Sequence, residues 1–99
     1  MVRYTEKDAK ECFEELAKAL GKEYGDACYI EKDGKKVTKI GCWKLDCNPV
    51  YGGCVVQEFV NEGGAVSMPL GYRRTPREFC DCVEFTLNVI KILKEQKGD

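Results

Sequence analysis

The sequence has 99 residues, enough for one domain with a single core and too few for two. Its 16 basic and 17 acidic residues give a net charge of −1, so overall charge predicts neither nucleic-acid nor membrane binding. Apolar residues make up 43% of the chain, which excludes a disordered protein, and no apolar run reaches the ~18 residues of a transmembrane helix. We therefore expect one domain over residues 1–99. The first residues carry no apolar signal segment, which predicts a cytoplasmic protein.

The first predicted element is a helix over residues 5–20. Thr5 and Asp8 have the spacing of a capping box, in which each side chain bonds the backbone amide of the other residue. On a helical wheel one side collects the apolar residues Ala9, Cys12, Phe13, Leu16, Ala17, Ala19 and Leu20. This narrow apolar stripe indicates a helix that lies on a sheet.

Strand-like segments follow. Three β-prone runs cover residues 27–31, 36–46 and 54–60. Asp33-Gly34 between the first two runs predicts a hairpin turn. Gly41 stands where the alternation of the second run changes phase, so we expect a bulge there. A fourth strand over residues 65–70 would lie at an edge, because it contains Pro69.

A second helix is predicted from Pro76 to about Lys94. Thr75 supplies a capping residue, Pro76 occupies the first helical position and Glu78 the third. The resulting order is α-β-β-β-(β)-α. It predicts an α+β fold with a three- to four-stranded antiparallel sheet and both helices packed on one face.

The second helix carries more apolar surface than one sheet can cover. Its core stripe is expected to contain Phe79, Cys82, Val83, Leu87, Ile90 and Leu93. Phe85, Val89 and Ile92 extend this stripe sideways, and they require a further partner. The first helix packing alongside is one such partner, and a two-fold homodimer through Phe85, Val89 and Ile92 is another. The two arrangements are compatible.

The chain contains seven cysteines and no histidine. Their spacing does not fit a zinc site, so no metal or other cofactor is expected. Reduced thiols buried in the core are the simplest interpretation. Disulfides are the alternative; they are rare in mesophilic cytosol but common inside hyperthermophilic archaea, and the abundant Lys and Glu residues fit such a source. Because seven is odd, at least one thiol stays reduced or crosses to another chain.

Basic residues gather before the second helix. Arg73, Arg74 and Arg77 stand where helix amides and the helix dipole favour an anion, which predicts a phosphate or carboxylate site. Tyr72 beside them and Tyr51 in a glycine-bearing loop are placed to stack on bases. The alternative is a solvated patch whose arginines pair with nearby acids. We call these five residues the arginine corner.

No catalytic residues are identified, since histidine is absent and nothing marks a cysteine as a nucleophile. Two functions remain open for a non-enzymatic protein. The first is a binding module that holds an anionic partner, such as nucleic acid, through the arginine corner. The alternative is an interaction or assembly factor that binds a host protein or a second copy through the apolar face of the second helix.

Four short motifs in residues 43–90 support a resemblance. They are Trp43-Lys44-Leu45-Asp46, Pro49-Val50-Tyr51-Gly52-Gly53, Asn61-Glu62-Gly63-Gly64 and Arg73-Arg74-Thr75-Pro76-Arg77-Glu78-Phe79. In these motifs the chain resembles small uncharacterised α/β proteins encoded by viruses and other mobile elements of bacteria and archaea. Cys47 and Cys54 stand where aromatic residues are expected. The resemblance implies a small domain in a host cytoplasm that acts by binding.

Overall fold

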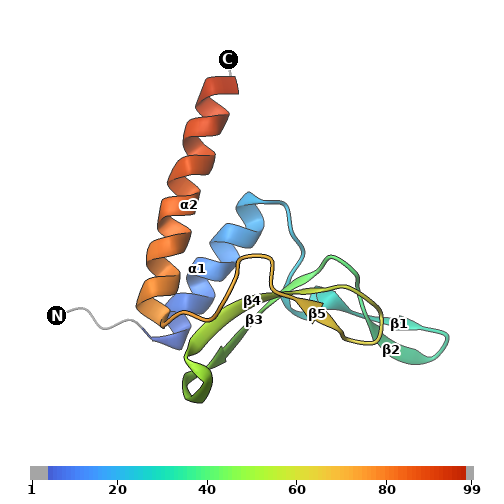
Figure 1. The fold of residues 1–99 in the computed structure, drawn as a ribbon. Coiled ribbons are helices and arrows are strands. Elements are labelled where there is room, and N and C mark those ends of the chain that lie inside the picture. Colours follow the sequence, from blue (N-terminus) through green and yellow to red (C-terminus); the bar gives the residue numbers. More distant parts are fainter. Residues whose placement is uncertain (1–4, 98–99) are drawn as a thin grey trace.

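The structure is a computed structural model that describes residues 5–97. Its elements in chain order are α1 (Glu6–Ala19), the short 3₁₀ helix η1 (Gly25–Cys28), β1 (Tyr29–Lys32), β2 (Lys35–Thr38), β3 (Trp43–Asn48), the 3₁₀ helix η2 (Pro49–Tyr51), β4 (Gly53–Phe59), β5 (Val66–Ser67) and α2 (Pro76–Lys97). This is the α+β order expected from the sequence. Both helices pack against the β3–β4 strands and stand on the same side of them (Figure 1).

The strands form two antiparallel sheets where a single sheet was expected. β1 and β2 pair only with each other, while β3, β4 and β5 form a three-stranded sheet in that order. The predicted strand over residues 36–46 is therefore two strands. The bulge expected at Gly41 is confirmed: the Gly41 amide donates to the Phe59 carbonyl at 2.8 Å and the Phe59 amide donates to the Cys42 carbonyl at 3.0 Å, so two residues lie opposite one. Gly41 has a φ of 87°, as such a bulge requires of its first residue, and the turn over residues 39–42 leads into it from β2.

The remaining strand boundaries differ from prediction at their ends. The first strand begins at Tyr29 and not at residue 27, because η1 occupies the residues before it. The fourth strand shortens to Val66–Ser67, paired at the edge of β4. The Asp33-Gly34 hairpin turn is confirmed: both residues have positive φ, 53° and 77°, as a type I′ turn requires.

Both predicted helix starts are confirmed. At α1 the Thr5 amide donates to the Asp8 carboxylate at 2.8 Å and the Asp8 amide donates to the Thr5 hydroxyl. At α2 the Thr75 amide donates to the Glu78 carboxylate at 3.0 Å and the Glu78 amide donates to the Thr75 hydroxyl at 3.2 Å. Each reciprocal pair satisfies an amide that the helix itself leaves without an acceptor.

The main core lies between the two helices and β3–β4. Its buried side chains are Ala9, Phe13, Leu16, Ala17, Trp43, Cys54, Val56, Phe79 and Val83. The indole N–H of Trp43 donates to Glu58 at 2.7 Å, so the buried ring keeps its polar atom bonded. A second, smaller cluster of Cys28, Cys42 and Phe59 lies at the base of the β1–β2 hairpin.

The two helices run side by side in the same direction but differ in length (Figure 1). α1 has 14 residues and α2 has 22, which correspond to about 21 Å and 33 Å. Ala19, the last residue of α1, lies beside Leu87 and Ile90. The final turns of α2 therefore extend beyond the helix that covers its earlier turns. Leu20, expected on the apolar stripe of α1, is exposed because the helix has already ended.

Candidate functional site

The side of α2 that faces away from α1 exposes large apolar residues. Phe85 is 71% exposed, Ile92 53% and Val89 39%. These are the residues that the sequence analysis assigned to a further partner. α1 does pack along α2, but it covers the side that carries Val83, Leu87 and Ile90. The first helix therefore does not cover the surplus apolar surface of α2.

Two residues predicted for the core of α2 are instead exposed. Leu93 lies beyond the end of α1, so neither helix nor sheet reaches it. Cys82 is exposed as well, and on the helical wheel it stands on the same side as Phe85 and Val89. We call Cys82, Phe85, Val89 and Ile92 the α2 stripe. Their spacing of three, four and three residues is that of a coiled-coil seam. This spacing in the sequence could have placed Cys82 on the stripe.

Arg73 of the arginine corner points inward. Its guanidinium forms an ion pair with Asp46 and donates to the backbone carbonyls of Asp46, at 3.2 Å, and Gly53, at 2.9 Å. These partners belong to β3 and β4. Arg73 thus ties the chain before α2 to the end of the sheet, and both terminal nitrogens of its guanidinium donate within the molecule.

The rest of the arginine corner lies nearer to solvent. The Arg74 guanidinium lies 4.8 Å from the centre of the Tyr72 ring and donates to the carbonyl of Leu70 at 3.1 Å. The Tyr51 ring lies 6.0 Å from the Arg73 guanidinium. Tyr72 and Tyr51 are 74% and 71% exposed, and Arg77 is also exposed. The structure thus arranges the five residues as two arginine–tyrosine pairs and one exposed arginine.

The amino end of α2 already holds an anionic side chain. The Glu78 carboxylate accepts the Thr75 amide, and this hydrogen bond is the main reason why the pKa of Glu78 is below its usual value of 4.5. The Arg74 charge lowers the same pKa further. Glu78 therefore places a negative charge at the helix start, close to where the sequence analysis expected an external anion.

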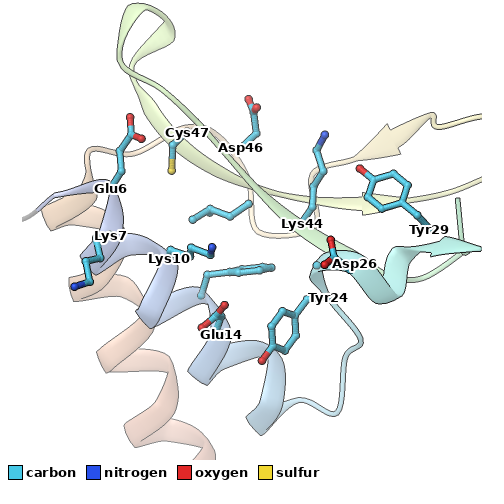
Figure 2. Close-up of a pocket in the computed structure, with 13 residues that line it drawn as sticks. Glu6, Lys7, Lys10, Glu14, Tyr24, Asp26, Tyr29, Lys44, Asp46 and Cys47 are labelled. Atoms are coloured by element: carbon cyan, nitrogen blue, oxygen red, sulfur yellow. The ribbon is translucent and has the colours of Figure 1, made fainter.

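A hollow of about 700 Å³ lies between α1, η1 and β3 and was not predicted. Figure 2 shows Lys10 extending into it from α1, with Glu14 and Tyr24 at one end and Cys47 at the other. Its lining contains charges of both signs: three lysines, Lys7, Lys10 and Lys44, and four acids, Glu6, Glu14, Asp26 and Asp46. This balance favours neither anions nor cations.

Four of the seven cysteines form disulfides, contrary to the expectation of reduced thiols. Cys28 pairs with Cys42, and Cys47 pairs with Cys54 directly across the β3–β4 ladder. Cys12, Cys80 and Cys82 remain as thiols. The predicted burial is confirmed for most of the set, including Cys28, Cys42, Cys54 and Cys80. The pairing could not be read from spacing, because the sequence does not show which residues face each other across a ladder.

The part of the chain that the structure describes contains no group of three or more Cys, Asp or Glu side chains placed to hold a metal ion. Within residues 5–97, no helix has the length and apolar character needed to cross a membrane. The search for similar proteins found no match to this chain among protein-family models, curated proteins or solved structures.

Proposed function

We propose that the protein is a non-enzymatic binding module that associates through the α2 stripe, and that a second copy of the chain is its first partner. The observation that supports this proposal is the exposure of Phe85, Val89 and Ile92 on a helix whose opposite side is packed. Burying a fully exposed side chain of this kind is worth roughly 1.5–3 kcal/mol, and each of the three forgoes the share of it that corresponds to its exposed surface.

The pattern of the stripe indicates what kind of surface covers it. A three-four-three spacing places its residues in one seam along the helix, and such a seam fits the matching seam of another helix. A two-fold dimer brings two identical seams together without any other component. α1 ends at Ala19, so the last turns of α2 are not covered by it. A neighbouring helix has room to pack along these turns.

A pair of single substitutions tests this proposal. Val89→Glu places a charge in the middle of the stripe, whereas Asn88→Glu places the same charge on the adjacent exposed side of α2. Sedimentation velocity should show a dimer for the wild type and for Asn88→Glu, and a folded monomer for Val89→Glu. A wild-type protein that remains monomeric at several hundred micromolar would contradict the proposal.

The arginine corner supports a second candidate function, binding of an anionic partner such as nucleic acid. The exposed Tyr72 ring, with the Arg74 guanidinium stacked on it, has the arrangement that stacks on bases, and Arg77 adds an exposed charge. The variant Tyr72→Ala with Arg77→Ala leaves the inward contacts of Arg73 in place. If this function exists, the wild type should bind single-stranded nucleic acid in a salt-dependent manner, and the variant should lose most of that binding.

The two disulfides constrain the cellular compartment in which the protein is found. Disulfides persist in oxidising compartments and in the cytoplasm of hyperthermophiles. The cytoplasmic location, and the viral or mobile-element origin suggested by residues 43–90, therefore fit a hyperthermophilic host. Growth temperature of the source and the thiol content of protein isolated from it would test this placement.

A further inference from the structure

We propose that Cys12 and Cys80 are the site of a third disulfide, which joins α1 covalently to α2. The Sγ atoms of the two residues lie 2.9 Å apart, closer than the van der Waals contact of two sulfur atoms. They come from different helices, 68 residues apart in the chain. Oxidation of this pair therefore requires only a small adjustment of two side chains that already face each other.

Among the cysteines of one chain, Cys12 and Cys80 are the pair that remains able to form a third disulfide. Four are already joined as Cys28–Cys42 and Cys47–Cys54. Of the remaining three, Cys80 and Cys82 are about 200° apart around α2 and point in different directions. Cys82 is exposed, whereas Cys80 is buried against α1. Six cysteines then form three disulfides, and Cys82 is the odd thiol.

The two sulfurs have different roles in the reaction. Cys12 is half-buried and accessible to a small oxidant, while burial and the contact with Cys12 raise the pKa of Cys80 to about 12. The thiolate of Cys12 attacks a low-molecular-weight disulfide such as oxidised glutathione, which forms a mixed disulfide and releases one thiol. Cys80 then loses its proton and attacks the Cys12 sulfur, which releases the second thiol. Two protein thiols are oxidised and one small disulfide is reduced.

Thiol counting tests the proposal directly. The wild-type protein is equilibrated with oxidised glutathione, unfolded in guanidinium chloride and alkylated with N-ethylmaleimide, and its intact mass is measured. We expect neither N-ethylmaleimide nor glutathione on Cys12 or Cys80, one of the two on exposed Cys82, and a linked peptide pair containing Cys12 and Cys80 in a non-reducing digest. Three alkylated cysteines, glutathione retained on Cys12, or a linkage of Cys80 to any other residue would overturn the proposal.

Melting temperatures provide a second measurement under the same oxidising conditions. Cys12→Ala and Cys80→Ala should each lower the Tm by about 8 °C or more, because each breaks a link that closes a long loop. The double variant should melt within about 2 °C of the less stable single variant, since the bond is lost only once. Asn88→Ala, at an exposed position of α2 outside the α2 stripe, is the control and should leave the Tm nearly unchanged. Losses that add in the double variant would contradict a covalent bond.

Discussion

At the residue scale, the chain before α2 is held to the sheet by a few close contacts. The Cys54 amide donates to the Arg74 carbonyl at 2.6 Å, and the Arg74 amide donates back to Cys54 at 2.9 Å. Gly53 permits this approach, because a Cβ at that position would lie 2.1 Å from the Arg74 carbonyl oxygen. The same approach brings the Arg73 guanidinium to the end of β3–β4. The start of α2 is therefore fixed by β4.

Arg73→Ala should destabilise the protein. The substitution removes the ion pair with Asp46 and two hydrogen bonds to backbone carbonyls, at a cost of about 1–3 kcal/mol. Thermal unfolding monitored by circular dichroism should show a Tm lower by several degrees. Arg77→Ala, which removes an exposed arginine of the same segment, is the control and should have little effect. Equal Tm values for the two variants would show that the inward contacts of Arg73 contribute nothing.

The capping carboxylate of Glu78 should make stability depend on pH. Its pKa is lower in the folded protein than the usual 4.5, so the carboxylate stabilises the fold above that pH. This contribution is lost as the pH falls below 4.5 and through the lowered pKa. Glu78→Gln should therefore lower the Tm by a few degrees at pH 7 and have a smaller effect near pH 3. Glu84→Gln, which removes a carboxylate from the exposed side of the same helix, is the control at pH 7 and should leave the Tm nearly unchanged.

The residue contacts that could be predicted are those between neighbours in sequence. Both capping boxes and the Asp33-Gly34 turn involve residues at most three positions apart, so local spacing was enough to identify them. The partner of Arg73 is 27 residues away in β3. A sequence does not show which acid or carbonyl such a side chain meets, and for this reason the anion site and the arginines paired with nearby acids stayed open as alternatives.

At the element scale, helices were predicted more accurately than the sheet. α1 and α2 follow from caps and apolar periodicity, and both lie within a few residues of their predicted ranges. The strand over residues 36–46 was wrong because its two halves pair with different partners: β2 pairs with β1, and β3 pairs with β4. The bulge expected at Gly41 lies opposite Phe59, where the β3–β4 ladder begins, and the chain before it turns away into the hairpin.

The length difference between α1 and α2 explains the main error in the predicted core. Periodicity places Leu93 on the core side of α2, but it does not show where the covering helix ends. α1 ends at Ala19, beside Leu87 and Ile90, so core positions further along α2 have no neighbour in the described chain. Phe85, Val89 and Ile92 are exposed, which agrees with the prediction that α2 carries more apolar surface than the sheet can cover. Their role in a dimer stays a prediction.

At the scale of the whole molecule, the protein is flat and open. Its extents are 45 × 42 × 19 Å and its radius of gyration is 15.0 Å, compared with about 13 Å for a compact domain of this length. In Figure 1 the helices rise from one end of the strands and the β1–β2 hairpin extends from the other. The two parts have separate cores, and the hairpin's core contains only Cys28, Cys42 and Phe59.

This division predicts that the hairpin depends on its disulfide more than the helical part does. An isolated two-stranded hairpin is marginally stable in water. Here it is joined to the rest by the Cys28–Cys42 bond, by hydrogen bonds such as Thr38 to Asn61, and by the exposed Lys32–Glu62 ion pair. The bond closes a loop between residues 14 apart, which stabilises the closed form by about 3 kcal/mol.

Replacing Cys28 and Cys42 together by Ala should open the hairpin locally while the helical core stays folded. Amide hydrogen exchange should accelerate about 100-fold in β1 and β2, as loss of about 3 kcal/mol requires, with little change in the middle of α1. The matched variant, Cys47→Ala with Cys54→Ala, removes a bond inside the main sheet and should affect β3 and β4 while the hairpin amides keep their protection. If exchange in β1, β2 and α1 accelerates by the same factor in the first variant, the two cores unfold as one cooperative unit and the division is wrong.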